Sequence, residues 1–384
     1  MAPPRLRVAV DATPLVTLGG QRSGVGTFVA GALEALATRP ELDVVAYALT
    51  FRGRKVWRHV LPPGARPVGI AVPARLVRAT WLRSSWPPLE LFAGRADVAH
   101  GTNFVAPPVR RGGAVATVHD LTPLRYPELV EADAAAYPSL VKAAVDRGAF
   151  VHTPSRYVAA EVVDLLGVPA ERVVAVAHGT PPSASGDPVR GRAAAGAERY
   201  VLAVGTVEPR KAYPDLVRAF SPLAAGDPGL RLVVAGRHGW GSEAFDAAVA
   251  ALPADIRSRV RATGWVPDGE RNDLLAGAAV LAYPSLYEGF GLPPLEAMAA
   301  GVPVVATDAG SLSEVLGAAA PLVPVGDVDA LAEALAGALA LDGTGREAVV
   351  AAGRAHAASF TWEACAAGLA ALYGRAAEAS MPGR

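Results

Sequence analysis

The sequence predicts an α/β protein with two doubly wound parallel-sheet domains. With 384 residues and 52% hydrophobic residues, the chain is too long for one ordinary core. Short β-branched segments alternate with helical segments in two series, which is the pattern of parallel sheets covered by helices. A turn-rich stretch near residue 180 separates the two series and favours one linker between two domains.

The first series fits one N-terminal domain. Its strands and helices are expected, in chain order, at 7–10, 25–37, 114–118, 134–147, 151–153, 156–166 and 173–177. Residues 179–188 are rich in glycine, proline and serine, as turn-rich connections are. We therefore expect an N-terminal domain at 1–178 and a linker at 179–199.

The second series fits a C-terminal domain at 200–360. Its strands and helices are expected at 200–204, 216–220, 230–235, 245–252, 260–263, 274–278, 280–283, 293–300 and 302–306. The closing segment 361–377 follows once this domain is complete. It predicts a helix with Thr361 as its N-cap.

Cysteine content and hydropathy restrict the class of protein. Cys365 is the only cysteine, so no intramolecular disulfide is possible, and residues 1–7 lack the apolar run of a signal peptide. No stretch reaches about 18 apolar residues without a charge, proline or glycine. These observations favour a cytoplasmic protein, in which any membrane contact is peripheral.

Charge is unevenly distributed although the formal net charge is zero. Residues 1–178 hold 20 Lys and Arg against 14 Asp and Glu, and the excess lies between Arg52 and Arg111. This segment is either a solvated surface or a surface for an anionic partner, such as lipid headgroups or a charged acceptor. Within it, residues 75–92 interleave arginines with apolar residues that include Trp81. They predict either a helix packed on its own sheet or a peripheral membrane surface with tryptophan as interfacial anchor.

Ligands of open parallel sheets bind beyond the carboxyl ends of the strands, so residues that directly follow a strand are functional candidates. The glycine-rich loop 19–27 enters a helix whose backbone N–H groups can hold phosphate; the alternative is a turn without a ligand. Its Gly24-Val25-Gly26 resembles part of a dinucleotide fingerprint, but Val29 stands in place of the third glycine. A dinucleotide-dependent oxidoreductase is therefore disfavoured.

Two more candidates follow predicted strands. His119 and Asp120 lie where an apolar strand meets a loop, and the imidazole of His119 is expected to donate to a sugar hydroxyl or to polarise an acceptor. Arg210 and Lys211 follow the strand at 200–204 and precede a helix. This pair suits a diphosphate, because arginine binds phosphate bidentately and lysine adds a mobile charge.

The most specific motif runs from Tyr283 to Val305. Glu288 lies in a glycine-containing loop, and Glu296 follows in the helix that the next prolines open. Between the two glutamates, the N–H groups of residues 289–292 lie at the positive end of that helix. A carboxylate on each side of an anion-binding helix start can hold sugar hydroxyls with one group and ribose hydroxyls with the other.

These motifs resemble glycosyltransferase family 4, whose signature is two glutamates separated by seven residues. The resemblance covers nearly the whole chain. It rests on the glycine loop, His119-Asp120, and the segments 205–211, 234–237, 263–267, 288–296 and 360–362.

The resemblance implies a GT-B fold, in which two Rossmann-like domains face a central cleft and the last helix, within 361–384, packs back onto the N-terminal domain. It assigns Glu288 to hydroxyls of the donor sugar and Glu296 to the ribose, with Arg210 and Lys211 neutralising the diphosphate. Further donor contacts are implied for Gly20, Gly205, Gly236, Arg237, Val266, Gly289, Phe290, Gly291, Leu292 and Leu295. On the acceptor side it implies His119 next to the transferring sugar, with Asp120 and Tyr126 contacting the acceptor.

Enzymes of this kind retain the anomeric configuration and bind no metal, because arginine and lysine stabilise the leaving diphosphate. We accordingly expect neither a metal nor a cofactor. One departure is Ala212, since similar members often carry asparagine after the lysine. Asp327-Val328-Asp329 has the form of a metal-binding pair in transferases of another fold, but it precedes the predicted helix 330–339 and is better explained as an N-cap.

The substrates are less well defined. Resemblance to mannosyltransferases through residues 118–123 and 283–292 makes GDP-mannose our first choice of donor. The acceptor is expected to be a glycan, a glycolipid or a small molecule, as in polysaccharide biosynthesis, and not a nucleic acid. Two other classes stay open: a sugar-nucleotide epimerase of similar architecture, which needs no acceptor, and a nucleotide-sugar binding protein without transferase activity.

Overall fold

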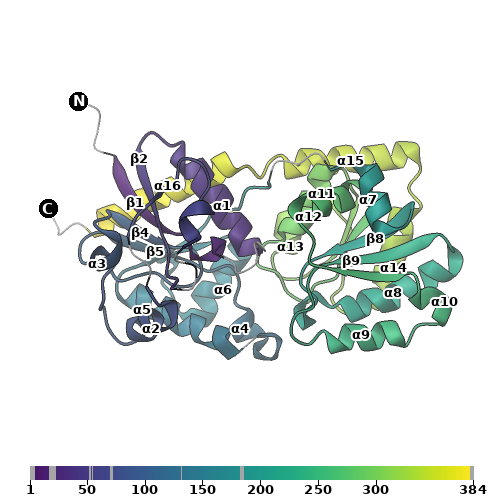
Figure 1. Ribbon diagram of the computed structural model, residues 1–384, viewed down its shortest axis with the longest axis horizontal. Helices are drawn as coiled ribbons and strands as arrows, with labels where there is room; N and C mark the ends of the chain where they lie inside the picture. Colours follow the sequence, from purple (N-terminus) through teal and green to yellow (C-terminus); the bar gives the residue numbers. More distant parts are fainter. Residues whose placement is uncertain are drawn as a thin grey trace. The chain divides into compact units, whose positions relative to one another are not determined.

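The computed structural model describes residues 5–16, 23–51, 53, 55–69, 72–130, 132–181 and 186–380. The chain forms two compact units (Figure 1). The N-terminal unit comprises Met1–Gly179 together with Phe360–Arg384, and the C-terminal unit comprises Thr180–Ser359. None of the described helices combines the length and apolar character that crossing a bilayer requires.

The N-terminal unit is built on a parallel sheet that has seven strands within the described residues, in the order β3-β2-β1-β4-β5-β6-β7. The strands are β1 Leu6–Asp11, β2 Leu42–Tyr47, β3 Arg66–Pro67, β4 Val98–Gly101, β5 Gly113–Thr117, β6 Phe150–Thr153 and β7 Val173–Ala175. The helices are α1 Gly24–Ala37, α2 Ala74–Trp81, α3 Glu90–Ala93, α4 Thr122–Arg125, α5 Tyr137–Asp146, α6 Arg156–Leu166 and α16 Trp362–Ala379.

Alternating residues of the strands divide the N-terminal core into two layers. Val8 and Val10 of β1 pack under α1 and α16, whereas Ala9 faces the layer under α2, α3, α5 and α6. The close packing of α16 on α1 depends on Gly31, because a Cβ there would lie 2.2 Å from the Trp362 ring. The last helix of the chain therefore belongs to the core of the first unit.

The C-terminal unit contains a second parallel sheet, with six strands within the described residues, in the order β10-β9-β8-β11-β12-β13. Its strands are β8 Arg199–Val204, β9 Leu230–Ala235, β10 Val260–Gly264, β11 Val280–Tyr283, β12 Val304–Thr307 and β13 Leu322–Val323. Its helices are α7 Pro188–Ala195, α8 Tyr213–Gly226, α9 Glu243–Ala250, α10 Ala254–Arg257, α11 Asp268–Gly277, α12 Leu292–Ala300, α13 Leu312–Leu316, α14 Val328–Leu339 and α15 Gly343–Ala357. Helices α8, α9 and α14 cover one face of this sheet, and α7, α11, α12 and α15 lie on the other (Figure 1).

Two doubly wound parallel sheets confirm the predicted fold class, and several local differences have physical causes. The predicted linker 179–199 contains α7, which Asp187 caps and which Arg190 ties to Asp273 of α11 through a 2.8 Å ion pair. The helix predicted at 134–147 begins as a 3-10 turn, and its α-helical part starts at Tyr137, where Pro138 occupies a first-turn position that needs no N–H.

The two predicted N-caps are confirmed. The Asp327 carboxylate accepts a 2.9 Å hydrogen bond from the Ala330 N–H at the start of α14. The Thr361 hydroxyl oxygen accepts a 3.1 Å bond from the Ala364 N–H at the start of α16. Among the described His, Cys, Asp and Glu residues, no group of three or more could hold a metal ion.

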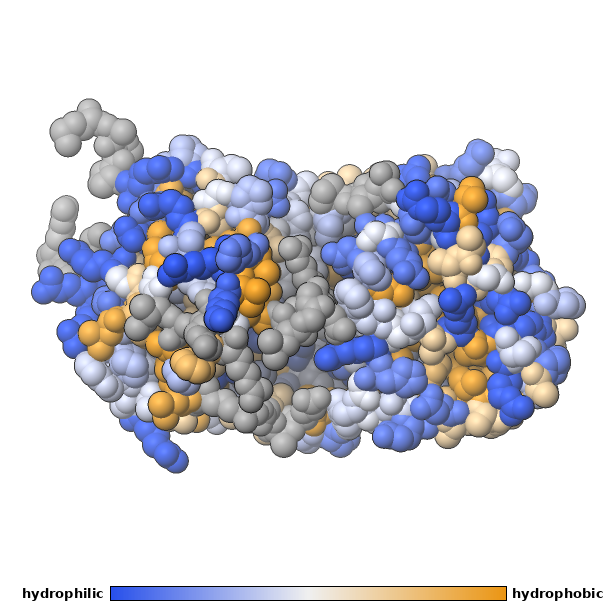
Figure 2. All heavy atoms as spheres, viewed as in Figure 1, coloured by the Kyte–Doolittle hydropathy of each residue, from blue (hydrophilic) through white to orange (hydrophobic). Residues whose placement is uncertain are grey.

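The basic segment of the N-terminal unit combines buried and exposed apolar residues. Val77 and Trp81 of α2 lie in the core, and the Trp81 indole donates a 2.9 Å hydrogen bond to the Pro87 carbonyl. Trp81 therefore cannot be the interfacial anchor predicted for residues 75–92. By contrast, Leu76 and Trp86 are 65% and 57% exposed. Figure 2 shows hydrophobic residues interspersed with hydrophilic ones on the visible face.

Candidate functional site

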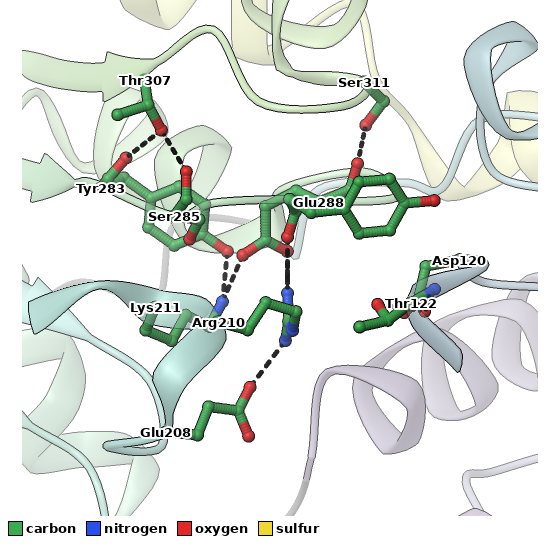
Figure 3. Close-up of polar contacts among 11 residues, drawn as sticks. Asp120, Thr122, Glu208, Arg210, Lys211, Tyr283, Ser285, Glu288, Thr307 and Ser311 are labelled. Atoms are coloured by element: carbon green, nitrogen blue, oxygen red, sulfur yellow. Dashed lines mark hydrogen bonds and ion pairs between the residues drawn. The ribbon is translucent and has the colours of Figure 1, made fainter. Parts of the chain in front are cut away.

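The carboxyl edge of the C-terminal sheet carries a cluster of charged side chains (Figure 3). The Lys211 ammonium lies 2.6 Å from one carboxylate oxygen of Glu288, and an Arg210 guanidinium nitrogen lies 2.9 Å from the other. Arg210 also donates to Glu208 at 2.8 Å, and Lys211 donates to the Tyr283 hydroxyl at 2.8 Å. Three of the residues predicted for catalysis are thus in direct contact.

This cluster is buried, yet it is ionised. The side chains of Lys211 and Glu288 are 8% and 9% exposed. Burial alone would raise the pKa of the Glu288 carboxyl, but Arg210 and Lys211 outweigh it and hold the pKa at about 2. Burial lowers the pKa of the Lys211 ammonium, and the Glu288 carboxylate opposes that shift.

Backbone contacts fix the loop that presents Glu288. Its carbonyl accepts hydrogen bonds from the Ser311 N–H at 2.9 Å and from the Ser311 hydroxyl at 3.1 Å. Gly310 has φ +61°, and a Cβ there would lie 2.3 Å from the Glu288 carbonyl oxygen, so this close approach requires glycine. On the other side, Arg210 donates to the Tyr287 carbonyl at 3.0 Å. The backbone that carries this carboxylate is therefore held on both sides.

Glu296 lies on α12, one turn after the helix begins, in a different environment. Burial raises the pKa of its carboxyl, and the opposing charge is Arg271 of α11, whose guanidinium nitrogen lies 3.7 Å away. The Arg271 Nε is buried without a hydrogen-bond partner among the described residues. Glu296 is thus set apart from the Glu288 cluster and has its own cation.

The loops after β8 and β9 bring further predicted donor residues together. The Gly205 N–H donates to the Ala235 carbonyl at 3.0 Å, and the Val207 N–H donates to the Arg237 carbonyl at 2.9 Å. A Cβ at Gly236 would lie 1.8 Å from the Gly205 carbonyl oxygen, so these loops meet backbone to backbone. The Arg237 side chain is exposed, and Val266 is half-buried in the loop that follows β10.

The glycine loop between the two glutamates forms the start of α12. Gly291 has φ +99° and precedes the first residue of the helix, Leu292. Phe290 and Leu292 are almost buried, and Leu295 is 0% exposed. Complete burial of Leu295 does not fit the donor contact predicted there. Gly289 lies in the same loop, and Gly20 lies outside the described residues.

The predicted acceptor residues lie in the N-terminal unit. His119 Nε2 donates a 2.8 Å hydrogen bond to the Thr102 carbonyl, so in the neutral ring Nδ1 is an acceptor. Burial lowers the pKa of this imidazole, which favours the neutral form. The predicted donation by His119 is therefore corrected, because in the neutral ring the other nitrogen, Nδ1, can accept a hydrogen bond but cannot donate one. The Asp120 carboxylate accepts from the Thr122 N–H and hydroxyl at the start of α4, and Tyr126 follows the end of that helix.

Several residues that shape these sites were not predicted from the sequence. Tyr283, Glu208 and Ser311 contact the charged cluster directly, and Arg271 pairs with Glu296. Glu208 precedes two predicted site residues in the chain, which was a usable signal. Nothing in the local sequence connects Ser311 or Arg271 to the glutamates.

Two parallel-sheet units, one of which presents a loop glutamate to adjacent basic residues at the carboxyl edge of its sheet, define the class of protein as a GT-B glycosyltransferase. Two family models agree: Glycosyltransferase Family 4 matches residues 22–184, and Glycosyl transferases group 1 matches residues 198–340. O-antigen chain mannosyltransferase B of Escherichia coli is 34% identical over 277 residues, covering 70% of this chain and 71% of that protein. The chain belongs to glycosyltransferase family 4.

Two further similarities support narrower conclusions about this chain. D-inositol 3-phosphate glycosyltransferase of Mycobacterium avium (strain 104) is 39% identical over 199 residues, which is 50% of this chain but only 46% of that protein. Sucrose-phosphate synthase from Thermosynechococcus elongatus superposes with a TM-score of 0.73 at 22% identity, over 97% of this chain and 99% of that one. At this identity the superposition supports the fold alone.

Proposed function

We propose that this glycosyltransferase moves a hexose, with retention of anomeric configuration, from a nucleotide-diphosphate sugar to a hydroxyl acceptor. GDP-mannose is the first choice of donor, supported by the similarity to the O-antigen mannosyltransferase. The acceptor is a glycan, a glycolipid or a small molecule. We further propose that neither a metal nor a cofactor takes part, and that the protein acts in the cytoplasm.

The charged cluster of Arg210, Lys211 and Glu288 is the observation that carries this proposal. As the bond between the anomeric carbon and the diphosphate oxygen breaks, negative charge grows on the leaving diphosphate. Preorganised cations stabilise that charge more than they stabilise the bound substrate, so they lower the barrier to reaction. Glu288, held by both cations, would accept hydrogen bonds from hydroxyls of the donor sugar.

Retention follows if the acceptor attacks from the face that the diphosphate leaves. In that step the acceptor oxygen forms the new bond to the anomeric carbon, and its proton passes to the departing phosphate oxygen. The leaving group thereby serves as the base, so no carboxylate nucleophile is needed. His119 in the N-terminal unit would accept a hydrogen bond at Nδ1 from a substrate hydroxyl, with Asp120 and Tyr126 as neighbouring acceptor contacts.

Glu296 is proposed to bind the ribose hydroxyls of the nucleotide. Its carboxyl is buried, so it needs a positive partner to stay ionised, and Arg271 at 3.7 Å supplies one. Gly205, Gly236, Arg237 and Val266 are proposed to line the base and phosphate side of the same nucleotide.

Substitution of the two glutamates tests these assignments. Glu288→Gln should abolish transfer, and circular dichroism melting measures the stability that it loses because the buried Lys211 ammonium keeps no close carboxylate. Glu296→Gln should weaken binding of the substrate and of the transition state to a similar degree, because a ribose contact is made throughout the reaction. Glu270→Gln, at an exposed position on α11, is the matched control. Transfer at the parental rate by Glu288→Gln would refute the central assignment.

Donor identity and stereochemistry need separate measurements. A panel of nucleotide sugars is screened by thermal stabilisation, since a bound ligand at about 100 times its Kd stabilises the fold by about 2.7 kcal/mol. GDP-mannose should give the largest increase in melting temperature. A larger increase with another nucleotide sugar would identify that sugar as the donor instead. Proton NMR of the first product formed should show the anomeric configuration of the donor; the opposite anomer would exclude retention.

A further inference from the structure

We propose that a pocket at the amino edge of the N-terminal sheet binds a phosphate ester. The pocket has a volume of about 330 Å³ and is lined by Ser85, Gly113, Arg147, Gly148, Arg172 and Ser380, among others. Gly113 begins β5, whereas His119 and Asp120 follow the carboxyl end of that strand. The pocket is therefore separate from the proposed acceptor residues, and it does not depend on the proposed function.

Two arginines, Arg147 and Arg172, line this pocket. The Arg172 guanidinium carbon lies 4.8 Å from the centre of the Phe150 ring at the start of β6, and that of Arg375, which is outside the pocket lining, lies 5.2 Å from the same ring. Two cations on the wall of one pocket repel each other, and an anion bound in the pocket would relieve that repulsion.

Within the described part of the chain, Arg147, Arg172 and Arg375 form no ion pair with a carboxylate, although the charge of Asp146 partly opposes the lowering of the Arg147 pKa by burial. Each of the three donates to a backbone carbonyl instead, at 3.0, 2.9 and 2.8 Å. The acidic residues closest to them in sequence, Asp146, Glu171 and Glu378, are exposed.

Phosphate is the anion that this arrangement fits. A guanidinium has five N–H donors in a planar fork, and phosphate oxygens accept two of them side by side. Each of the three arginines commits one nitrogen to a carbonyl, and Ser85 is an exposed hydroxyl on the pocket wall. Burial lowers the pKa of Arg147, which a bound anion would reverse.

Two sources could supply the phosphate ester. One is a soluble phosphorylated metabolite, and the other is the headgroup of an anionic lipid. The rim favours testing the lipid, because Trp86 is 57% exposed next to Ser85 and Arg110 lies over its ring at 5.8 Å. Both sources place the same phosphate chemistry against Arg147 and Arg172.

Calorimetric titration of the full chain with glycerol 1-phosphate tests the site. Arg172→Gln should weaken binding about tenfold or more, since a charge-assisted hydrogen bond contributes that much. The matched control is Arg58→Gln, because Arg58 also lies over an aromatic ring, Trp57, and also donates to a glycine carbonyl, that of Gly69. Arg375→Gln is a second variant, and circular dichroism melting checks that each variant folds.

The donor site also attracts phosphate, so the paired variant Arg210→Gln with Lys211→Gln is titrated in parallel. Binding that survives in the pair but is lost in Arg172→Gln and Arg375→Gln supports the pocket. Binding that is lost in the pair and unchanged in Arg172→Gln overturns it.

Vesicles identify the source. If phosphatidylglycerol vesicles displace glycerol 1-phosphate and phosphatidylcholine vesicles do not, the ligand is a lipid headgroup, and residues 75–92 lie at the membrane. If neither displaces it, the ligand is a soluble phosphate ester. Equal affinity of the parent, Arg172→Gln and Arg58→Gln for glycerol 1-phosphate would refute the pocket altogether.

Discussion

Two buried clusters of polar side chains, one in each unit, differ in charge. In the N-terminal unit, His100 lies 2.7 Å from the hydroxyls of both Tyr373 and Thr117, and Thr117 lies 2.9 Å from His152. This network contains no carboxylate. In the C-terminal unit, the buried groups are the Lys211 ammonium and the Glu288 carboxylate, in direct contact.

The difference shows what decides whether a buried group carries charge. Burial lowers the pKa of His152 to about 4, because the hydrogen bond to the Val176 carbonyl stabilises the imidazolium less than burial destabilises it. Burial acts on Glu288 as well, but two cations hold its pKa at about 2. The histidine network of the N-terminal unit is therefore neutral, whereas the cluster in the C-terminal unit has preorganised charge of the kind that leaving-group stabilisation requires.

Of the variants considered, replacement of Lys211 should have the largest effect on stability, because it disrupts the charged cluster of the C-terminal unit. Lys211→Met leaves the buried Glu288 carboxylate without its closest partner, which should destabilise the C-terminal unit by about 3–5 kcal/mol. Arg210→Met should cost less stability, since its side chain is 19% exposed. Both should lower turnover about 100- to 1000-fold. Urea unfolding and turnover at saturating donor measure the two effects.

The double variant Lys211→Met with Glu288→Gln is the control. It leaves neither a cation nor an anion buried alone, so it should recover stability without recovering activity. Unchanged turnover in both single variants would remove the phosphate role from this pair.

Lowering the pH should destabilise the N-terminal unit before it destabilises the C-terminal unit. Unfolded histidine titrates near 6.5 and folded His152 near 4, so the unfolded state binds more protons in that window, and the N-terminal unit loses stability as pH falls through it. His100, His119 and His178 shift in the same direction. Asp11, whose pKa burial raises to about 6, acts with the opposite sign between pH 6 and 3.8, but it is one group against four. His152 alone contributes on the order of 3 kcal/mol.

The C-terminal unit should lose the contribution of Glu288 only between pH 4.5 and about 2, because its folded pKa is depressed. Hydrogen exchange followed by mass spectrometry, corrected for the intrinsic effect of pH, resolves the units within one chain. Loss of protection in the C-terminal unit first would contradict the assignment of charge states.

Much of the proposed donor site could be predicted because its residues directly follow strands. Arg210 and Lys211 come after β8, and Glu288 comes after β11, so the rule for parallel sheets brings them to one edge. Tyr283 could not be predicted as a partner of Lys211, since inside an apolar strand it resembles an ordinary core residue. Arg271 comes from a separate helix, and its contact with Glu296 depends on how α11 and α12 pack.

The same rule could also have predicted a cluster of four histidines in the N-terminal unit. His100 and His152 lie in β4 and β6, and His119 and His178 follow β5 and β7, which are adjacent strands. Because parallel strands align their ends, His119, His152 and His178 lie around Phe28, and His100 lies next to His152. Strand β4 was not predicted, because its sequence Val-Ala-His-Gly is short and polar at the centre. Only the hydrogen bonds of His100 explain why that histidine is buried.

Tyr373→Phe tests the uncharged histidine network of the N-terminal unit and should have a smaller effect on stability. It removes the hydroxyl next to His100 Nδ1 and leaves a buried ring nitrogen unpaired, which should destabilise the N-terminal unit by about 1–3 kcal/mol. Tyr137→Phe is the matched control, because Tyr137 stacks on Phe104 at 4.7 Å and is half-buried. Equal unfolding free energies for the two variants would mean that the network contributes nothing beyond packing.

The smallest expected effect concerns Asp327. Its replacement tests whether carboxylates of the C-terminal unit also bind a metal ion. Asp327 caps α14 through the Ala330 N–H, so Asp327→Ala should cost about 1 kcal/mol of stability. Asp342 caps α15 through the Gly345 N–H at 2.8 Å and has no second aspartate two residues later, so Asp342→Ala should cost about the same. If Asp327 only caps a helix, transfer by both variants should match the parent, and EDTA should change none of the three. A loss of transfer confined to Asp327→Ala, restored by added Mn²⁺ or Mg²⁺, would assign a metal to Asp327 and Asp329 and would overturn the metal-free mechanism.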